Sequence, residues 1–228
     1  SSRTGYIFSR RFCRAWHSHI TRIWTKECSP LLAGNNDFYL NAASTGIAIP
    51  GVTLKIDNPN EAGVGEILAK GENIMLGYYK DQEATDYVLR DGWFHTGDLG
   101  CMDPDSALYI KGRIKNVIVT QNGKNIYPEE LENRLMQFPE IGEVLVLGTV
   151  QKDDIQVKAK IFPNLDVLKE KLGRLPSGED IHAAITNIIR DINKRMPTYK
   201  QIRETEILTD VLEKTTTQKI KRFGSNMK

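Results

Sequence analysis

The sequence lacks the features that mark secreted and membrane-spanning proteins. It has only three cysteines, Cys13, Cys28 and Cys101, an odd number without metal-site spacing, which favours a reduced, cytoplasmic setting. Its apolar runs, such as residues 144–147, have the length of a core strand and are far too short to cross a bilayer. Residues 1–9 contain no long apolar core followed by a small-residue cleavage site, so we expect no secretory signal.

An excess of charge of one sign is also lacking. Lys and Arg number 31 against 29 acids, and a net charge of +2 gives no overall attraction for nucleic acid or membrane. Apolar residues make up 40% and charged residues 26% of the 228, an ordinary soluble composition with room for one large or two small domains. We therefore expect no nucleic-acid partner and no transmembrane segment, although peripheral membrane contact stays open, and the sequence does not fix an oligomeric state.

The chain falls into three regions of different pattern. Residues 1–30 are basic and rich in Ser, Arg and His, with little periodicity. Residues 31–113 are predicted to form short strands between turns that contain Gly and Asp, with alternating apolar residues at 51–57 and 107–113 and a short polar helix at 81–89. We expect this region to be a distorted antiparallel β-barrel-like subdomain in which the segment 91–100, DGWFHTGDLG, is a turn.

Residues 114–228 show strands that alternate with helices, and the boundary is placed at residues 113–115. A helix is predicted from Pro128, because acids follow in its first turn, and a long amphipathic helix at about 180–195 is predicted to stop at Pro197. The fold class is therefore α+β, with a small α/β C-terminal domain that has a three-stranded or larger sheet and flanking helices. Residues 116–120 of this domain are predicted to form a buried strand. Further strands are predicted at 142–150, 154–162 and 204–209.

Four segments occur in one order and at workable spacings: GEILAKGENIMLGYYKD, DGWFHTGDLG, YIKGRIKNVIVTQNGKNIYPEELE and TTTQKIKR. Together they resemble the adenylate-forming (AMP-binding) superfamily, in particular its acyl-CoA synthetases of the long-chain fatty-acid type, over about residues 27–223. That family uses ATP and Mg²⁺ to convert a carboxylate to an acyl-adenylate, releases pyrophosphate, and transfers the acyl group to a thiol, usually coenzyme A. The resemblance implies that fatty acid, ATP and coenzyme A are the small-molecule substrates.

Asp98 and Arg113 match the family residues that bind the nucleotide. A carboxylate accepts hydrogen bonds from two vicinal hydroxyls at once, so Asp98 suits the ribose, and the glycines beside it allow close approach. The fixed, charged guanidinium of Arg113 suits ribose and phosphate oxygens. Without the resemblance, the plain alternatives are a turn aspartate and a strand-end arginine in a surface ion pair. His95, a lone histidine, is predicted to be structural.

Three further residues take their roles from the resemblance alone. Lys115 falls at the position of the hinge about which the family's C-terminal domain rotates between two half-reactions, and a hinge residue need not be small. Gly123 and Lys124 lie in the segment that resembles the loop lining the coenzyme A tunnel. A plain strand–turn–helix connection is the structural alternative for that loop.

Lys219 matches the C-terminal lysine that acts in the family's adenylation step. An ammonium on a flexible stem would meet the substrate carboxylate and the α-phosphate as charge develops between them. Gln218 stands where the family usually has Gly, and the alternative is a solvated basic tail.

The beginning of the chain departs from the family pattern. Glu27, in ECSP, matches the family glutamate that serves Mg²⁺, but the residues before it do not match. A one-nucleotide shift across residues 16–24 would restore the family glycines, so we interpret residues 1–30 as a degenerate remnant altered by a frameshift. A metal site at His17 and His19 is the weaker alternative, because two residues do not complete a ligand set.

The family's Ser/Thr/Gly-rich phosphate loop does not occur in these 228 residues, so we expect them to be inactive without further sequence. The function predicted is ATP-dependent activation of a fatty acid and its transfer to coenzyme A, within a longer enzyme. The alternatives left open are a truncated, non-catalytic product or binding module, a ligase for another carboxylate or for a carrier protein, and an anionic-surface binder.

Overall fold

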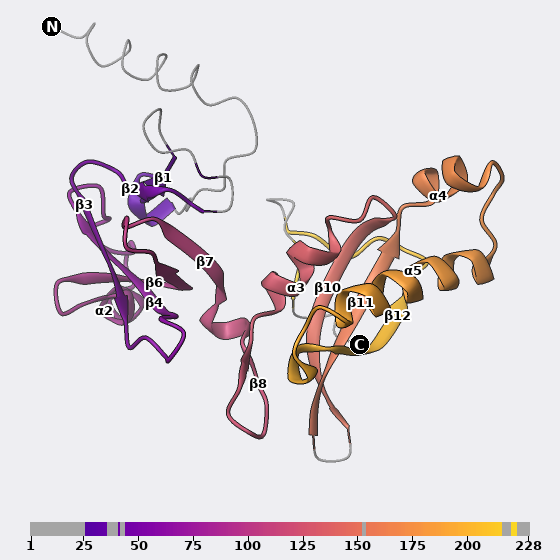
Figure 1. The fold of residues 1–228 in the computed structure, drawn as a ribbon. Helices are drawn as coiled ribbons and strands as arrows, with labels where there is room; N and C mark the ends of the chain where they lie inside the picture. Colours follow the sequence, from indigo (N-terminus) through magenta and orange to yellow (C-terminus); the bar gives the residue numbers. More distant parts are fainter. Residues whose placement is uncertain (1–25, 36–40, 42–43, 152–153, 216–219, 223–228) are drawn as a thin grey trace, which may run out of the picture. The chain divides into compact units, whose positions relative to one another are not determined.

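The computed structural model describes residues 26–35, 41, 44–151, 154–215 and 220–222 (Figure 1). The chain divides into two compact units, Ser1–Lys115 and Asn116–Lys228. The frameshift interpretation and the His17–His19 alternative concern residues outside the described ranges.

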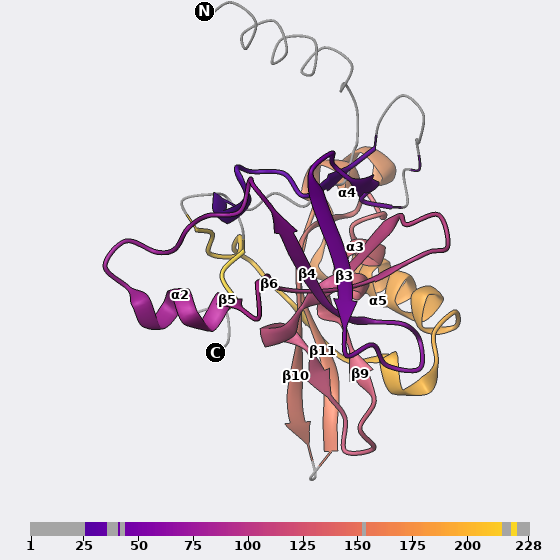
Figure 2. The same ribbon diagram turned by 90° about the vertical axis from the view of Figure 1, so that its left-hand side faces the viewer.

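The first unit is built on a five-stranded antiparallel sheet in the order β3-β4-β6-β5, with β7 also paired to β6. In Figure 2, β3 and β4 lie side by side, in agreement with their residue pairing. None of the sheets in the described part of the chain closes on itself. The elements are η1 (Lys26–Cys28), β1 (Ala33–Gly34), β2 (Ile47–Ala48), β3 (Val52–Asp57), β4 (Gly65–Gly71), α2 (Gln82–Val88), β5 (Leu89–Arg90), β6 (Trp93–Met102) and β7 (Leu108–Arg113).

Alternating apolar residues build this sheet and its core. Phe94 on β6 and Ile67 on β4 are buried, and they pack with side chains from the η1–β1 segment. The polar helix α2 begins where Asp81 accepts a hydrogen bond from the Ala84 amide at 2.9 Å, a typical N-cap. The buried residues of this core are Cys28, Leu32, Ala33, Ile67, Ala69, Phe94 and Leu108.

The prediction that DGWFHTGDLG is a turn was wrong for most of the segment. Only its first two residues turn the chain, with φ of 53° at Asp91 and 74° at Gly92. The remaining eight residues lie in β6, a ten-residue strand that pairs with three neighbours. The Gly and Asp residues indicated a turn, but pairing with β4 and β7 keeps them in the sheet.

The second unit is a three-stranded sheet in the order β10-β11-β12, covered by helices. β10 and β11 are antiparallel, whereas β12 runs parallel to β11. One face of the sheet packs against α3 and α5, through residues such as Val146, Ala159 and Ile185. The elements are η2 (Ile114–Asn116, at the unit boundary), β8 (Ile118–Val119), β9 (Asn125–Ile126), α3 (Pro128–Leu135), β10 (Ile141–Gln151), β11 (Asp154–Pro163), α4 (Leu165–Leu172), α5 (Gly178–Asn193), η3 (Thr198–Lys200) and β12 (Ile202–Ile207).

The α+β fold class is confirmed, with differences in detail. The predicted buried strand 116–120 is reduced to β8, and Val119 there is half exposed. Helix α4 was not predicted, although Asn164 caps it and Gly173 ends it with a positive φ. Helix α5 begins with a capping box between Ser177 and Asp180. None of the helices in the described residues is long and apolar enough to cross a membrane.

Candidate functional site

Asp98 lies in a bulge of strand β6. Glu66 of β4 pairs with Leu99, and Leu68 pairs with His95, so three residues of β6, 96–98, face the single residue Ile67. A bulge of this kind bends a strand locally and redirects its side chains. Gly97 has a φ of +69°, in the left-handed region that favours glycine.

Side chains replace the missing ladder hydrogen bonds of the bulge. The Thr96 hydroxyl donates to the Ile67 carbonyl at 2.7 Å and accepts from the Asp98 amide at 3.0 Å. The Gly97 amide donates to Glu66 Oε1 at 3.1 Å. Because buried backbone polar groups need partners, these bonds fix the bulge in one conformation.

The bulge brings Asp98 next to Arg113, the two residues that the sequence assigned to the nucleotide. They are direct cross-strand partners on β6 and β7, and Arg113 Nε lies 2.6 Å from Asp98 Oδ1. The Asp98 side chain is 11% exposed, whereas that of Arg113 is 51% exposed. The carboxylate is therefore held by a charged partner on the neighbouring strand, while the guanidinium stays accessible.

Arg113 of this pair, with Thr96 and Gly97 of the bulge, lines a cleft of about 460 Å³ within the first unit. Glu27 and Tyr78 contribute to its lining, and the Tyr78 hydroxyl donates to Glu27 Oε1 at 3.3 Å. Burial, followed by the negative charge of Glu27, raises the pKa of Tyr78. The full lining is Glu27, Glu66, Tyr78, Tyr87, Val88, Arg90, Phe94, His95, Thr96, Gly97, Arg113, Ile114 and Lys115.

The cleft lining includes the carboxylate of Glu27, the predicted Mg²⁺ ligand. The described residues include no group of three His, Cys, Asp or Glu side chains placed to hold a metal ion. Mg²⁺ commonly binds one or two carboxylates together with substrate phosphates and water. Glu27 alone would meet that requirement, so its predicted role is compatible with its place in the cleft lining.

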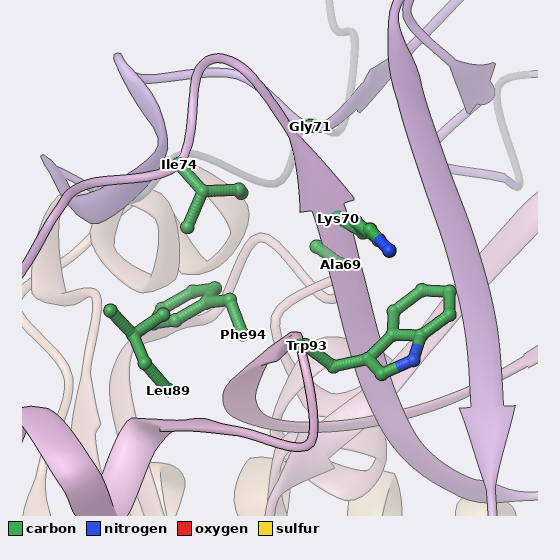
Figure 3. Close-up of a pocket in the computed structure, with 8 residues that line it drawn as sticks. Ala69, Lys70, Gly71, Ile74, Leu89, Trp93 and Phe94 are labelled. Carbon is green, nitrogen blue, oxygen red and sulfur yellow. The ribbon is translucent and has the colours of Figure 1, made fainter.

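A second, smaller pocket of about 180 Å³ lies along the same strands (Figure 3). Ile74, Leu89 and Phe94 lie together on one side of β4 in this view, with Trp93 beside Lys70. Lys55 Nζ lies 4.7 Å from the centre of the Trp93 ring, a cation–π contact. This pocket is mainly apolar and contains no carboxylate or histidine, so it supplies packing rather than catalytic groups.

The predicted hinge and tunnel residues are exposed, Lys115 in the short helix η2 and the other two in a turn. Lys115 is the last residue of the first unit and lines the cleft. Gly123, with a φ of +69°, and Lys124 form the exposed turn of the β8–β9 hairpin, where the Lys124 amide donates to Thr120 Oγ1 at 3.1 Å. Gly123 therefore suits the sharp turn.

Lys219 lies outside the described residues, but the segments that flank it are described. Lys214 and Ile220 form an antiparallel bridge, and the Lys221 amide donates to the Glu213 carbonyl at 2.8 Å. Arg222 Nη2 lies 2.5 Å from Glu132 Oε2 on α3. Burial raises the pKa of Glu132, although the charge of Arg222 opposes this shift.

Sequence reasoning missed Glu66 and Tyr78, both of which line the cleft. His95, predicted to be structural, has its Nδ1 2.9 Å from Glu66 Oε2. The contacts of these residues join segments far apart in sequence, such as Tyr78 with Glu27 and His95 with Glu66. The segments GEILAKG and LGYYKD pointed to the right region without singling out either residue.

Comparison with known proteins gives the same family as the sequence motifs. The model of the family "AMP-binding enzyme C-terminal domain" matches residues 115–223. The long-chain-fatty-acid–CoA ligase FadD15 of Mycobacterium tuberculosis is 34% identical over 197 residues, 80% of this chain and 32% of that protein. The indoleacetate–CoA ligase of Aromatoleum aromaticum is 41% identical over 121 residues, 51% of this chain and 24% of that protein.

A solved structure shows the same likeness along most of the chain. The o-succinylbenzoate–CoA synthetase of Bacillus subtilis, determined with ATP and a magnesium ion, superposes with a TM-score of 0.70 at 25% identity. The match covers 88% of this chain and 39% of that one, and the matched regions of both ligases above span at most a third of their lengths. Through its C-terminal domain, residues 115–223, the chain thus belongs to the AMP-binding, adenylate-forming enzymes, and it is similar to acyl- and aryl-CoA ligases over part of their length.

Proposed function

We propose that this chain supplies the ribose-binding edge and the C-terminal domain of an ATP-dependent acyl-CoA ligase acting on a long-chain fatty acid in the cytoplasm. The observation that carries the proposal is the ion pair between the buried Asp98 carboxylate and Arg113, which lines the cleft. The mycobacterial relative, named for long-chain fatty acids, supports the substrate class. The indoleacetate ligase makes an aryl acid the competing substrate.

Asp98 and Arg113 bind the nucleotide sugar in this proposal. One Asp98 oxygen lies against Arg113 Nε, and the carboxylate has further lone pairs for the ribose hydroxyls. Arg113 Nε orients the Asp98 carboxylate through the ion pair, and hydrogen bonds from the hydroxyls to a carboxylate are charge-assisted. Arg113, half exposed, also meets nucleotide oxygens.

Glu27 would hold Mg²⁺, which, when bound, neutralises charge on the ATP phosphates. Lys219 meets the carboxylate and the α-phosphate in the adenylation step. Lys115 is the hinge for rotation of the second unit, and Gly123 and Lys124 line the path of the coenzyme A arm. Coenzyme A is the acyl acceptor, in line with the ligases to which the chain is similar.

The test places residues 27–228 in the mycobacterial ligase, in exchange for the matching segment. Fatty-acid-dependent pyrophosphate release and acyl-CoA formation are measured separately, and a panel of fatty and aryl acids identifies the substrate class. We expect Asp98→Asn to lower kcat/KM for ATP about 100-fold, since two charge-assisted hydrogen bonds are weakened. Asp105→Asn, which removes an exposed carboxylate from the same unit, is the matched control.

Two further measurements complete the test. Lys219→Ala should lower adenylation ~100-fold or more while leaving thioester formation from preformed acyl-adenylate nearly unchanged. Equal loss in both half-reactions would contradict the role of Lys219, and an unchanged kcat/KM for ATP in Asp98→Asn would contradict that of Asp98. The unmodified 228-residue chain should release no pyrophosphate, and measurable release would show that it needs no further sequence.

A further inference from the structure

The Glu66 carboxylate contacts the bulge of β6 through both oxygens. Glu66 Oε1 accepts a hydrogen bond from the Gly97 amide at 3.1 Å, and Oε2 lies 2.9 Å from His95 Nδ1. The side chain is 16% exposed and that of His95 is 11% exposed, so water screens both contacts only weakly. One carboxylate on β4 thus holds the residues on either side of Thr96.

The chemistry of the histidine ring assigns a direction to the second contact. An ionised carboxylate only accepts hydrogen bonds, so Nδ1 of His95 carries the proton and donates it to Glu66. Arg90 Nη2 also lies 3.1 Å from the same nitrogen, but a protonated Nδ1 cannot accept from it. Glu66 is then the partner that orients the ring.

Residues 96–98 have no paired residue on β4, and within this bulge the Gly97 amide donates to Glu66 Oε1. Without Glu66 this N–H would lose its acceptor next to the peptide that leads into Asp98. Glycine reaches the positive φ of Gly97 without strain and also has many other conformations open to it, so contacts such as that of Glu66 select this one. Position and orientation of the Asp98 carboxylate therefore depend on a side chain of the neighbouring strand.

We propose that Glu66 is a positioning residue, which fixes the Gly97–Asp98 backbone so that Asp98 faces the two ribose hydroxyls of the nucleotide. This inference rests on the proposed function, in which Asp98 binds the ribose. Glu66 acts through Asp98 and forms no bond to the nucleotide. Its loss therefore lowers affinity only for ligands that carry the hydroxyls.

The experiment uses ¹⁵N-labelled 228-residue chain and two ligands, AMP and 2′,3′-dideoxy-AMP, which lacks both hydroxyls. Dissociation constants come from chemical-shift titrations, and hydrogen exchange of the Gly97 amide reports the bulge directly. The variants are Glu66→Ala, which removes both contacts, and Glu66→Gln, whose amide oxygen can still accept from Gly97. Glu61→Ala, at an exposed turn of the same unit, is the matched control.

For Glu66→Ala we expect Gly97 exchange to accelerate about tenfold and AMP affinity to fall about tenfold, the effect of one lost charge-assisted hydrogen bond. Affinity for the dideoxy ligand should not change. Glu66→Gln should restore most of the AMP affinity, and Glu61→Ala should match the original chain. A merely structural role would weaken both ligands equally.

Each other outcome overturns a defined part of the reasoning. Two outcomes for Glu66→Ala would overturn the positioning role. One is an equal loss of affinity for both ligands, and the other is an unchanged affinity for AMP. If the original chain prefers AMP over the dideoxy ligand, the ribose assignment of Asp98 stays intact in both cases. An original chain that binds both ligands equally, or binds neither, would overturn the ribose assignment of Asp98 and the positioning role with it. Unchanged Gly97 exchange in Glu66→Ala would overturn the proposed contact itself.

Discussion

Replacing Arg222 with alanine should destabilise the second unit through a carboxylate that is left buried. Arg222 Nη2 lies 2.5 Å from Glu132 Oε2 and 3.4 Å from Glu129 Oε1, and Nη1 donates to the Val146 carbonyl at 3.2 Å. Glu132 Oε1 accepts from the Val146 amide at 2.8 Å. The change removes the cation and leaves Glu132 in place between α3 and β10.

The expected loss follows from the burial of the pair. The side chains of Arg222 and Glu132 are 19% and 16% exposed. Surface pairs contribute up to about 1 kcal/mol, and breaking a fully buried pair costs about 3–5 kcal/mol, so we expect about 2 kcal/mol here. With a urea dependence of about 1.5 kcal/mol/M for a unit of this size, the midpoint should fall by roughly 1.3 M.

The loss should also depend on pH. Burial raises the pKa of Glu132, so the folded state disfavours the ionised form, and stability falls as the pH rises through that pKa. Removing Arg222 takes away an interaction that lowers this pKa. The deficit of the variant is therefore largest at neutral pH and shrinks as acid protonates Glu132.

Urea unfolding followed by pulsed hydrogen exchange and mass spectrometry measures the midpoint for peptides of α3 and β10. The sequence has no tryptophan after Trp93, which lies on β6 of the first unit, so tryptophan fluorescence of the same samples does not report unfolding of the second unit and should not change. Arg190→Ala on the exposed side of α5 is the control, with a midpoint shift within about 0.3 M.

A double variant isolates the pair. In a Glu132→Gln background, Arg222→Ala should cost much less, since no buried charge is left behind. An unchanged midpoint in the single variant, or the same cost in both backgrounds, would refute the reasoning from burial.

Three further predictions concern other parts of the chain. Hydrogen bonds from Arg174 and Ser177 lower the pKa of Asp180. Ionised Asp180 therefore stabilises the N-terminus of α5 at neutral pH, and this stabilisation is lost in acid. Hydrogen exchange of the Ile181 amide should speed up in acid because of this loss, and the effect should be missing in Asp180→Asn. A Cβ on Gly46 would lie 2.0 Å from the Gly34 backbone, and the φ of Gly46 is +91°. Gly46→Ala should therefore lower the free energy of unfolding, followed by Trp93 fluorescence, by ~3 kcal/mol. Gly51→Ala, whose Cβ would meet no atom within 4 Å, should lower it by about 1 kcal/mol. Leu135→Ala should cost the second unit about 3 kcal/mol in pulsed exchange, while Met136→Ala, half exposed, should cost under ~1; equal costs would contradict the core assignment.

Local patterns predicted most of the strands and the long helix because they depend on alternation and helical periodicity. Helix α4 was missed although its signals are local: Asn164 precedes it, Gly173 follows it, and Leu165, Leu168 and Leu172 lie on one face. The segment around Asp98 could not be predicted in this way. Its conformation depends on which residues of β4 and β7 face it, and single-sequence patterns do not contain that register.

The candidate site shows the same division. The motifs identified Asp98 and Arg113, and the structure brings these two side chains together. Glu66 has no distinguishing pattern of its own, because its partners are 29 and 31 residues away in sequence. Residues that position a functional group through long-range hydrogen bonds are visible only once the strands are paired.

The bulge of β6 also limits how this strand can change in length during evolution. Three residues opposite one add two, an even number, so the side chains before and after the bulge keep the same inward and outward alternation, with Phe94 and Gly100 both buried. A deletion of one residue between 95 and 99 would turn the far half of the strand inside out and expose what is now buried. Functional relatives should therefore differ here by two residues or by none, a length rule that an alignment of the family can check.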